Sequence, residues 1–280
     1  MNKIILINKE KGYTSFDVCN KLRRIFHIKQ IGHTGTLDPN ATGLLMVMIG
    51  RTCKVLPYIN HFKKTYIATM KLGIKTKTAD IWGEIIETQE YSMPEYNQIV
   101  NVLNSFKGPS KQIPPMTSAI KVNGKKLLEM QRQNIEYTPK PRDIFVYDIE
   151  LLDVNDEIKF KVEVSSGTYV RTLIEDIAKK LNTIGTMTSL IRTKIDDFDI
   201  NNSYTLEQIQ NDEYETMTNE ILLKKYYKTY EYENVSDIKN GKRVMIKSEE
   251  DTLMITHNNI IIAVYIKENN NIYKCKRGLW

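Results

Sequence analysis

A single carboxylate, Asp38, lies in a segment whose residue types control backbone geometry closely. The segment reads Gly32-His33-Thr34-Gly35-Thr36-Leu37-Asp38-Pro39-Asn40-Ala41-Thr42-Gly43-Leu44-Leu45. Gly32, Gly35 and Gly43 permit positive φ and the close approach of another chain, whereas Pro39 fixes its own φ directly after the acid. Such a loop can hold one carboxylate in one pose for nucleophilic or acid-base chemistry. The alternative is a tight turn in which the aspartate only accepts hydrogen bonds from backbone amides.

Positive charge is unevenly distributed along the chain. In total, Lys+Arg 40 against Asp+Glu 34 gives a formal net charge of only +6, which does not by itself identify a polyanion-binding protein. The bases between residues 11 and 37 face a single acid, Asp17, and the stretch from 107 to 142 is equally basic, with only Glu129 and Glu136 as acids. The two segments could form a surface that contacts a phosphate backbone. Alternatively, they are two lysine-rich faces that contact only solvent.

The cysteines and the hydropathy of the sequence bear on where in the cell the protein is expected to reside. Cys19, Cys53 and Cys275 are odd in number and have neither paired nor metal-ligand spacing, which favours reduced thiols. The apolar stretch at residues 4–7 is too short for a signal peptide, and no later stretch approaches the length of a membrane span. We therefore expect a soluble, cytoplasmic protein that does not associate with a membrane.

The hydrophobic pattern alternates between strand and helix periods without internal repeats. It predicts strands at residues 4–7, 44–49, 64–72 and 158–164, and helices after residues 14, 94 and 169. Thr14 and Asp17 have the spacing of a capping box. The helix after residue 94 is predicted to turn Tyr96, Ile99, Leu103 and Phe106 inward and to stop at Gly108. This irregular order favours an α+β fold with a mixed, largely antiparallel sheet and flanking helices.

Composition also predicts a division of the chain near residue 230. After about Tyr204 the sequence becomes acidic and helical, and short strand patterns follow from about Val235 to Trp280. We expect a large domain over residues 1–230, which includes the basic insertion at about 107–142, and a small β-rich C-terminal module over residues 235–280. The boundary is placed to within roughly ten residues, because no Pro/Gly-rich linker marks it.

The Asp38 segment, written GHTGTLDPxATGLL, resembles the catalytic motif of the TruB family, the tRNA pseudouridine-55 synthases. Four further segments are similar to the same family and extend the resemblance over most of residues 9–198: Lys9–Ser15, then 64–66 with 72–73 and 76–83, then 114–126, and finally 166–173 with 190–193. Glu10 replaces a proline of the family pattern. Ser166 stands where lysine is common, so one phosphate contact is either missing or supplied elsewhere. The resemblance supports the α+β fold.

The resemblance implies an isomerisation that breaks the bond from C1′ to N1 of uridine and rejoins the uracil through C5. That reaction needs one carboxylate, a way to hold the detached base, and neither a metal nor an organic cofactor. Asp38 is then the essential acid, acting either as a nucleophile or as a base on the sugar. Arg171 would pair with Asp38 and keep it ionised and oriented. Tyr66 would stack on the uracil and assist the proton change at C5.

Further residues are implied to bind the substrate. Leu190 would form an apolar wall against the base, Asp80 matches a family position in the site, and His33 would contact RNA and help displace the target nucleotide from its stack. The basic insertion resembles the mobile RNA-binding insertion of the family, in which the phosphate contacts would be Lys121, Lys125, Lys126 and Arg132. Asn123 and Gly124 are expected to form a turn that can position these basic side chains.

The C-terminal module resembles the small RNA-binding domain of these synthases. The implied partner is tRNA, bound through its T arm, and no protein partner is implied.

Other interpretations remain open at this stage. A non-catalytic RNA-binding or tRNA-folding protein on the same scaffold would use the same basic segments, but it would not need Asp38, Tyr66 and Arg171 together. An Asp-dependent glycoside hydrolase fits less well, because such enzymes usually need two catalytic carboxylates. Taken singly, Tyr66 and Leu190 are also ordinary core residues, Arg171 an ordinary surface arginine, and His33 a residue that braces its loop.

Overall fold

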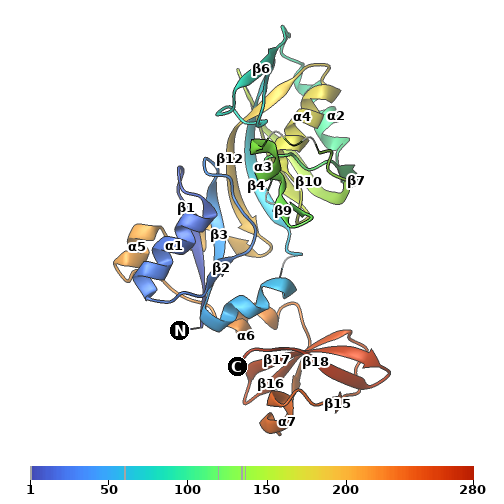
Figure 1. The fold of residues 1–280 in the computed structure, drawn as a ribbon. Coiled ribbons are helices and arrows are strands. Elements are labelled where there is room, and N and C mark those ends of the chain that lie inside the picture. The colour runs from blue at the N-terminus through green and yellow to red at the C-terminus, as the bar shows by residue number, and fades with distance from the viewer. Residues whose placement is uncertain (1, 60, 119, 134, 136) are drawn as a thin grey trace. The chain divides into compact units, whose positions relative to one another are not determined.

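The computed structural model describes residues 2–59, 61–118, 120–133, 135 and 137–280. The chain forms two compact units (Figure 1). The first contains Met1–Asp38, Leu45–Asn60 and Asn201–Trp280, and the second contains Pro39–Leu44 and His61–Ile200. Within the described residues, no helix is both long enough and apolar enough to span a membrane.

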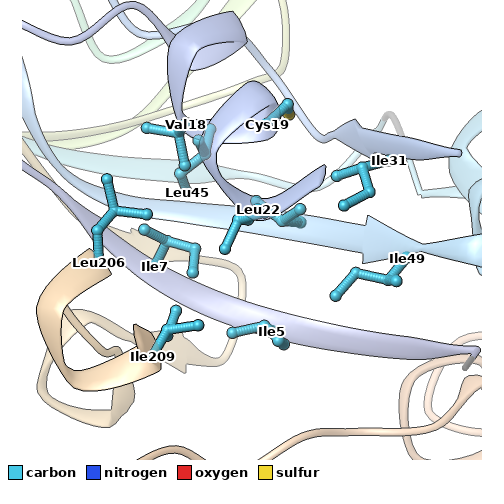
Figure 2. Close-up of a cluster of buried hydrophobic side chains, with 11 residues drawn as sticks. Ile5, Ile7, Val18, Cys19, Leu22, Ile31, Leu45, Ile49, Leu206 and Ile209 are labelled. Atoms are coloured by element: carbon cyan, nitrogen blue, oxygen red, sulfur yellow. The ribbon is translucent and has the colours of Figure 1, made fainter. Parts of the chain in front are cut away.

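The N-terminal part of the first unit is a small sheet with α1 packed on it. Strand β1 (Lys3–Lys9) lies beside β3 (Thr42–Ile49), and β2 (Ile31–His33) pairs with β3 in an antiparallel sense. Helix α1 (Ser15–Phe26) turns Val18 and Leu22 toward Leu45 and the β1 isoleucines, and α5 (Leu206–Gln210) adds two more apolar side chains (Figure 2). This packing keeps α1 close to the strands that lead into and out of the Asp38 loop.

The same unit contains the C-terminal residues. A 3-10 helix, η1 (Gly50–Tyr58), follows β3, and α6 (Asn219–Leu223) precedes a five-stranded sheet with the order β14-β16-β17-β18-β15. The remaining elements are β14 (Thr229–Glu231), α7 (Val235–Lys239), β15 (Val244–Met245), β16 (Thr252–His257), β17 (Ile260–Asn269) and β18 (Ile272–Gly278). Ile238 of α7 packs with Leu253, Tyr265 and Tyr273 in a separate core.

The second unit is built on a sheet with the strand order β12-β4-β11-β10-β7, whose neighbours pair antiparallel. The strands are β4 (Lys64–Leu72), β7 (Gly108–Gln112), β10 (Arg142–Val154), β11 (Ile158–Val164) and β12 (Gly185–Ile195), and β13 (Phe198–Asp199) pairs with β12. The first residues of β3, Thr42 and Gly43, join β12 by parallel pairing. Helices α2 (Tyr96–Asn104) and α4 (Val170–Lys180) lie next to each other against this sheet (Figure 1).

Two short hairpins and three short helical segments complete the elements. They are β5 (Ile74–Thr76) with β6 (Ile85–Thr88), β8 (Lys121–Val122) with β9 (Lys125–Lys126), α3 (Leu127–Arg132), η2 (Ile200–Asn202) and η1 above. The β8–β9 hairpin and α3 lie inside the basic insertion.

The structure confirms the expected α+β class and its largely antiparallel sheet, together with the small β-rich C-terminal part. The capping box at the start of α1 is also confirmed, because the Thr14 side chain accepts from the Asp17 amide while the Asp17 side chain accepts from the Thr14 amide. The inward position predicted for Tyr96 is wrong, since this side chain is 62% exposed. Tyr96 is the first residue of α2, and only Ile99 and Leu103, one and two turns later, are buried in this helix. The helix ends at Asn104, so Phe106 lies beyond it and is half-buried.

Candidate active site

The Asp38 loop connects two paired strands of the first unit. Ile31 of β2 lies opposite Ile49 of β3, and the Thr34 amide extends this pairing by donating to the Met46 carbonyl at 3.0 Å. The chain then turns at Gly35, whose φ is +81°. Asp38 is half-buried beside the buried Leu37. The loop is therefore a connection with fixed ends and a partly sheltered carboxylate.

Glycine is required at position 43 for two separate reasons. Gly43 has a φ of +102°, and a Cβ atom there would lie 2.4 Å from the carbonyl oxygen of Arg192. The two residues pair directly between β3 and β12. At Gly32, by contrast, a Cβ atom would lie 2.9 Å from a methyl group of Leu56, which is the end of a flexible side chain and can move aside. The close approach of another strand that the sequence predicted is thus confirmed at Gly43, where the neighbouring atoms are backbone.

Tyr66 and Leu190 lie on one face of the sheet in the second unit. Leu190 of β12 is directly opposite Ala68 of β4, and Arg192 is opposite Tyr66. Directly paired residues project to the same side, so Tyr66 and Leu190 are diagonal neighbours. Their side chains are 8% and 7% exposed. An aromatic ring and an apolar side chain are therefore neighbours on one face of this sheet.

Helix α4 packs on this same face. A Cβ atom on Gly185 of β12 would lie 2.8 Å from the Cβ atom of Ala178 in α4 and 3.2 Å from the Met70 side chain of β4. Met70 and Tyr66 are four residues apart in a regular strand, so they project to the same side. The helix that carries Arg171 in its first turn thus covers the face that carries Tyr66 and Leu190.

Arg171 connects three segments of the second unit and is only 5% exposed. Its Nη1 donates to the Thr78 carbonyl at 2.9 Å and to the Thr117 hydroxyl. Thr78 in turn donates from its hydroxyl to the Asp80 carboxylate at 2.8 Å. The structure therefore brings the two predicted residues Arg171 and Asp80 together through Thr78. Asp38 belongs to the other unit, so its pairing with Arg171 stays a prediction.

The β8–β9 hairpin presents the predicted lysines of the basic insertion. Asn123 and Gly124 have φ values of +49° and +85°, as a two-residue type I′ turn requires, and Lys121 lies opposite Lys126. Lys121 and Lys125 are exposed, as is Arg132 at the end of α3. The side chain of Lys126 lies outside the described part of the structure. The turn is confirmed, whereas the phosphate contacts stay predictions.

His33 is the last residue of β2, opposite Val47, and is half-buried. This position is one residue before the loop proper, so either RNA contact or bracing of the loop is compatible with it. Among the residues that the structure describes, no group of three His, Cys, Asp or Glu side chains is arranged to hold a metal ion.

Comparison with known proteins identifies the family. The model for the TruB family pseudouridylate synthase N-terminal domain matches residues 23–170, and the model for the tRNA pseudouridylate synthase B C-terminal domain matches residues 171–232. A protein of Mesoplasma florum named tRNA pseudouridine synthase B is 40% identical over 283 residues, which cover 99% of each chain. The chain belongs to the TruB family. A protein of the same name from Clostridium tetani is 40% identical over 271 residues, covering 95% of this chain and 92% of the relative.

Solved structures outside this close group share the fold of the TruB-family chain. A chain in the crystal structure of a Cbf5-Nop10-Gar1 complex aligns with a TM-score of 0.75 at 22% identity, covering 99% of this chain and 85% of the other. A chain in the structure of an H/ACA RNP bound to a substrate RNA aligns with a TM-score of 0.73 at 20% identity, covering 99% and 85%. At these identities the likeness establishes the fold alone.

Sequence reasoning on this TruB-family chain assigned no role to three residues that the structure places around the predicted site. Arg192 is 1% exposed, and its Nε donates to the Leu44 carbonyl at 2.6 Å. Thr117 provides the hydroxyl that contacts Arg171. The buried Lys64 donates to the Phe62 carbonyl at 2.6 Å and to the Ser166 hydroxyl at 3.1 Å. In the sequence, all three residues lie in segments that resemble the family, but that resemblance did not indicate which contacts they make.

Burial lowers the pKa of Lys64 from its usual 10.5 to about 8, and the nearby Arg192 charge acts in the same direction. The Lys64 ammonium contacts Ser166, the residue that stands where lysine is common in the family pattern. In α4, burial is the main cause that raises the pKa of Glu175 and also that of Asp176. Helix α4, which carries Arg171 in its first turn, thus also carries two carboxyl groups that ionise less readily than usual.

Proposed function

We propose that this protein converts uridine to pseudouridine at position 55, in the T arm of tRNA. The observation that carries the proposal is Asp38, a half-buried carboxylate on a loop with fixed ends, in a chain of the TruB family. The reaction is an isomerisation: the bond from C1′ to N1 breaks, a bond from C1′ to C5 forms, C5 loses a proton and N1 gains one. No oxidant or reductant is needed, so one carboxylate and a pocket for the base can suffice.

The proposed catalytic residues have distinct roles. Asp38 acts on the sugar, either as a nucleophile at C1′ or as a base. Tyr66 stacks on the uracil while the base is detached, and Leu190 supports it as an apolar wall; their adjacent positions on one sheet face support both roles. Arg171 pairs with Asp38 and keeps the carboxylate ionised. Asp80 belongs to the substrate-binding set and is connected to Arg171 through Thr78.

RNA binding is proposed to involve the basic insertion and the C-terminal module. The exposed Lys121 and Lys125, with Lys126 and Arg132, contact phosphates, and the tight Asn123–Gly124 turn holds the hairpin that carries the lysines. His33 fills the space that the displaced nucleotide leaves. The free thiols of Cys19, Cys53 and Cys275 fit a cytoplasmic tRNA-modifying enzyme.

Carbodiimide mapping of pseudouridine tests the proposed reaction and its position. The protein is incubated with an unmodified tRNA transcript and with an isolated T-arm hairpin, and a matched hairpin carries cytidine in place of the target uridine. We expect one modified position, uridine 55, in the first two RNAs and none in the third. Tight binding without any modification would favour the rival function, a non-catalytic RNA-binding or tRNA-folding protein. Modification at other uridines would contradict the T-arm assignment.

A further inference from the structure

The side chain of Ser15 makes an unusual long-range contact. Ser15 is the first residue of α1, 22 positions before Leu37 in the chain, and it is 1% exposed. The Leu37 amide donates to the Ser15 Oγ at 2.9 Å, and the same hydroxyl donates to the Leu37 carbonyl at 3.3 Å. Both backbone groups of the residue before Asp38 are therefore bonded to one buried hydroxyl.

These two bonds restrict the backbone that carries Asp38. The Leu37 carbonyl belongs to the planar peptide that joins Leu37 to Asp38, so a bond to that carbonyl orients the whole peptide plane. On the other side, Pro39 restricts the backbone of Asp38 by disfavouring its helical region. The Leu37 side chain is itself buried, at 2% exposed. The carboxylate is thus attached to a backbone that is constrained on both sides.

Ser15 is in turn held by the start of α1. Thr14 and Asp17 form the capping box, and the Thr14 amide donates to the Asp17 carboxylate at 3.0 Å. One turn further, the side chains of Val18 and Cys19 are in the core of the first unit. The position of the Ser15 hydroxyl is therefore set by the packing of α1 in this core, whereas the capping box adds to the stability of the helix end.

We propose that Ser15 is a positioning residue for Asp38, which transmits the rigid placement of α1 to the catalytic carboxylate through Leu37. This inference rests on the proposed function, in which Asp38 is the essential acid. A purely structural serine would satisfy two buried backbone groups and affect only stability. A positioning serine also affects the rate of the chemical step without affecting RNA binding.

The test uses the full-length protein and compares Ser15→Ala with Thr14→Ala. Thr14→Ala removes the capping bond and weakens the same end of α1, but it leaves the Ser15 hydroxyl in place. Each variant is measured for its melting temperature, its Kd for T-arm RNA, and its single-turnover rate at saturating protein. We expect Ser15→Ala to lower the single-turnover rate by about 10- to 100-fold, the scale of a small misplacement of a reacting group. Its Kd should stay within about twofold of the parent, because binding uses other contacts.

Thr14→Ala should lower the melting temperature at least as much and keep a rate within about threefold of the parent, since Leu37 stays bonded. Equal rate losses in the two variants would overturn the proposal, as would a parental rate in Ser15→Ala. Ser15→Thr and Ser15→Cys add an independent comparison, because threonine keeps the hydroxyl whereas a thiol is a weak donor and acceptor. Threonine should retain more of the rate, and equal rates for threonine and cysteine would contradict the positioning role.

Asp38→Asn separates this inference from the proposed function. Multiple turnover by Asp38→Asn would show that Asp38 is not the catalytic acid. Ser15 would then have no catalytic group to position. An inactive Asp38→Asn beside a fully active Ser15→Ala would overturn the role of Ser15 alone.

Discussion

At the scale of single residues, several side chains in the site hold others in place. Arg171 is bonded to Thr78 and Thr117 as well as being the predicted partner of Asp38. A planar guanidinium can serve several acceptors at fixed angles, whereas an ammonium group is a point charge on a flexible stem. The identity of the cation at this position should therefore matter as much as its charge.

We accordingly predict that Arg171→Lys lowers the single-turnover rate by roughly a hundredfold although the net charge is unchanged. The measurement is pseudouridine formation at saturating protein, beside Arg51→Lys, an exchange at an exposed arginine. A parental rate in Arg171→Lys would mean that the planar group is not needed. Equal losses in both variants would indicate a general effect of the exchange.

The second residue-scale prediction concerns Gly43. Gly43→Ala introduces both a strained φ and a Cβ atom 2.4 Å from the Arg192 carbonyl oxygen, whereas Gly108 has a similar φ of +104° with nothing within 4 Å. Gly108→Ala should reduce the free energy of unfolding by about 1–3 kcal/mol through backbone strain. Gly43→Ala should reduce the free energy of unfolding by about 1–3 kcal/mol more than Gly108→Ala does, because β3 and β12 must move apart to admit the Cβ atom. Equal losses of unfolding free energy in denaturant titrations of the two variants would contradict this prediction, because they would show that the Cβ atom at position 43 is accommodated beside Arg192 at no cost.

At the scale of elements, the β8–β9 hairpin should behave as an electrostatic contact to RNA. Replacing Lys121, Lys125 and Lys126 by Ala should weaken T-arm binding and flatten the plot of log K against log salt. Removing one lysine–phosphate pair lowers the slope by about 0.7 to 0.9. A control with the exposed Lys71, Lys159 and Lys161 replaced removes the same charge outside the proposed RNA-binding parts and should keep the parental slope. Identical slopes for parent and hairpin variant would mean that these lysines are only solvated.

Strand β4 offers a prediction about pH. Because the folded pKa of Lys64 is lowered to about 8 from 10.5, the unfolded chain binds more protons than the folded chain between these values. The free-energy cost of burying the charged Lys64 ammonium therefore lowers stability fully below about pH 8. This cost is relieved as the pH rises toward the pKa of the unfolded chain. The parent should gain up to about 3 kcal/mol of unfolding free energy relative to Lys64→Met over this range.

The control for this pH dependence is Lys161→Met on the neighbouring strand, where the lysine is exposed. The difference in unfolding free energy between the parent and this control should stay flat over the same range. A flat difference for Lys64→Met as well would show that the Lys64 ammonium is not desolvated in the folded protein.

The elements also show how far sequence reasoning reaches. Strand β4 and helix α1 were predictable, because apolar alternation and the capping pair Thr14 and Asp17 are local patterns. The turn at Asn123 was equally readable, since few residue pairs tolerate positive φ twice. Tyr96 was placed wrongly, because periodicity gives a face but does not show which end of a helix reaches the core.

At the scale of the whole molecule, the family motif in the sequence predicted the residues, and the structure added the contacts among them. The bond between Ser15 and Leu37 and the contact between Gly43 and Arg192 join residues far apart in the chain. Such contacts depend on strand order and register, which no local pattern encodes. The diagonal placement of Tyr66 and Leu190 likewise follows only from the pairing of β4 with β12.

The central claim is that Asp38 performs the chemistry on a uridine that the rest of the chain binds. The most direct measurement is multiple-turnover formation of pseudouridine in T-arm RNA by the parent and by Asp38→Asn, with the Kd of each for the same RNA. Asparagine keeps the shape of the side chain and removes its charge, so we predict complete loss of turnover with a Kd within about threefold of the parent. Turnover by Asp38→Asn above the background of protein-free RNA would contradict the account.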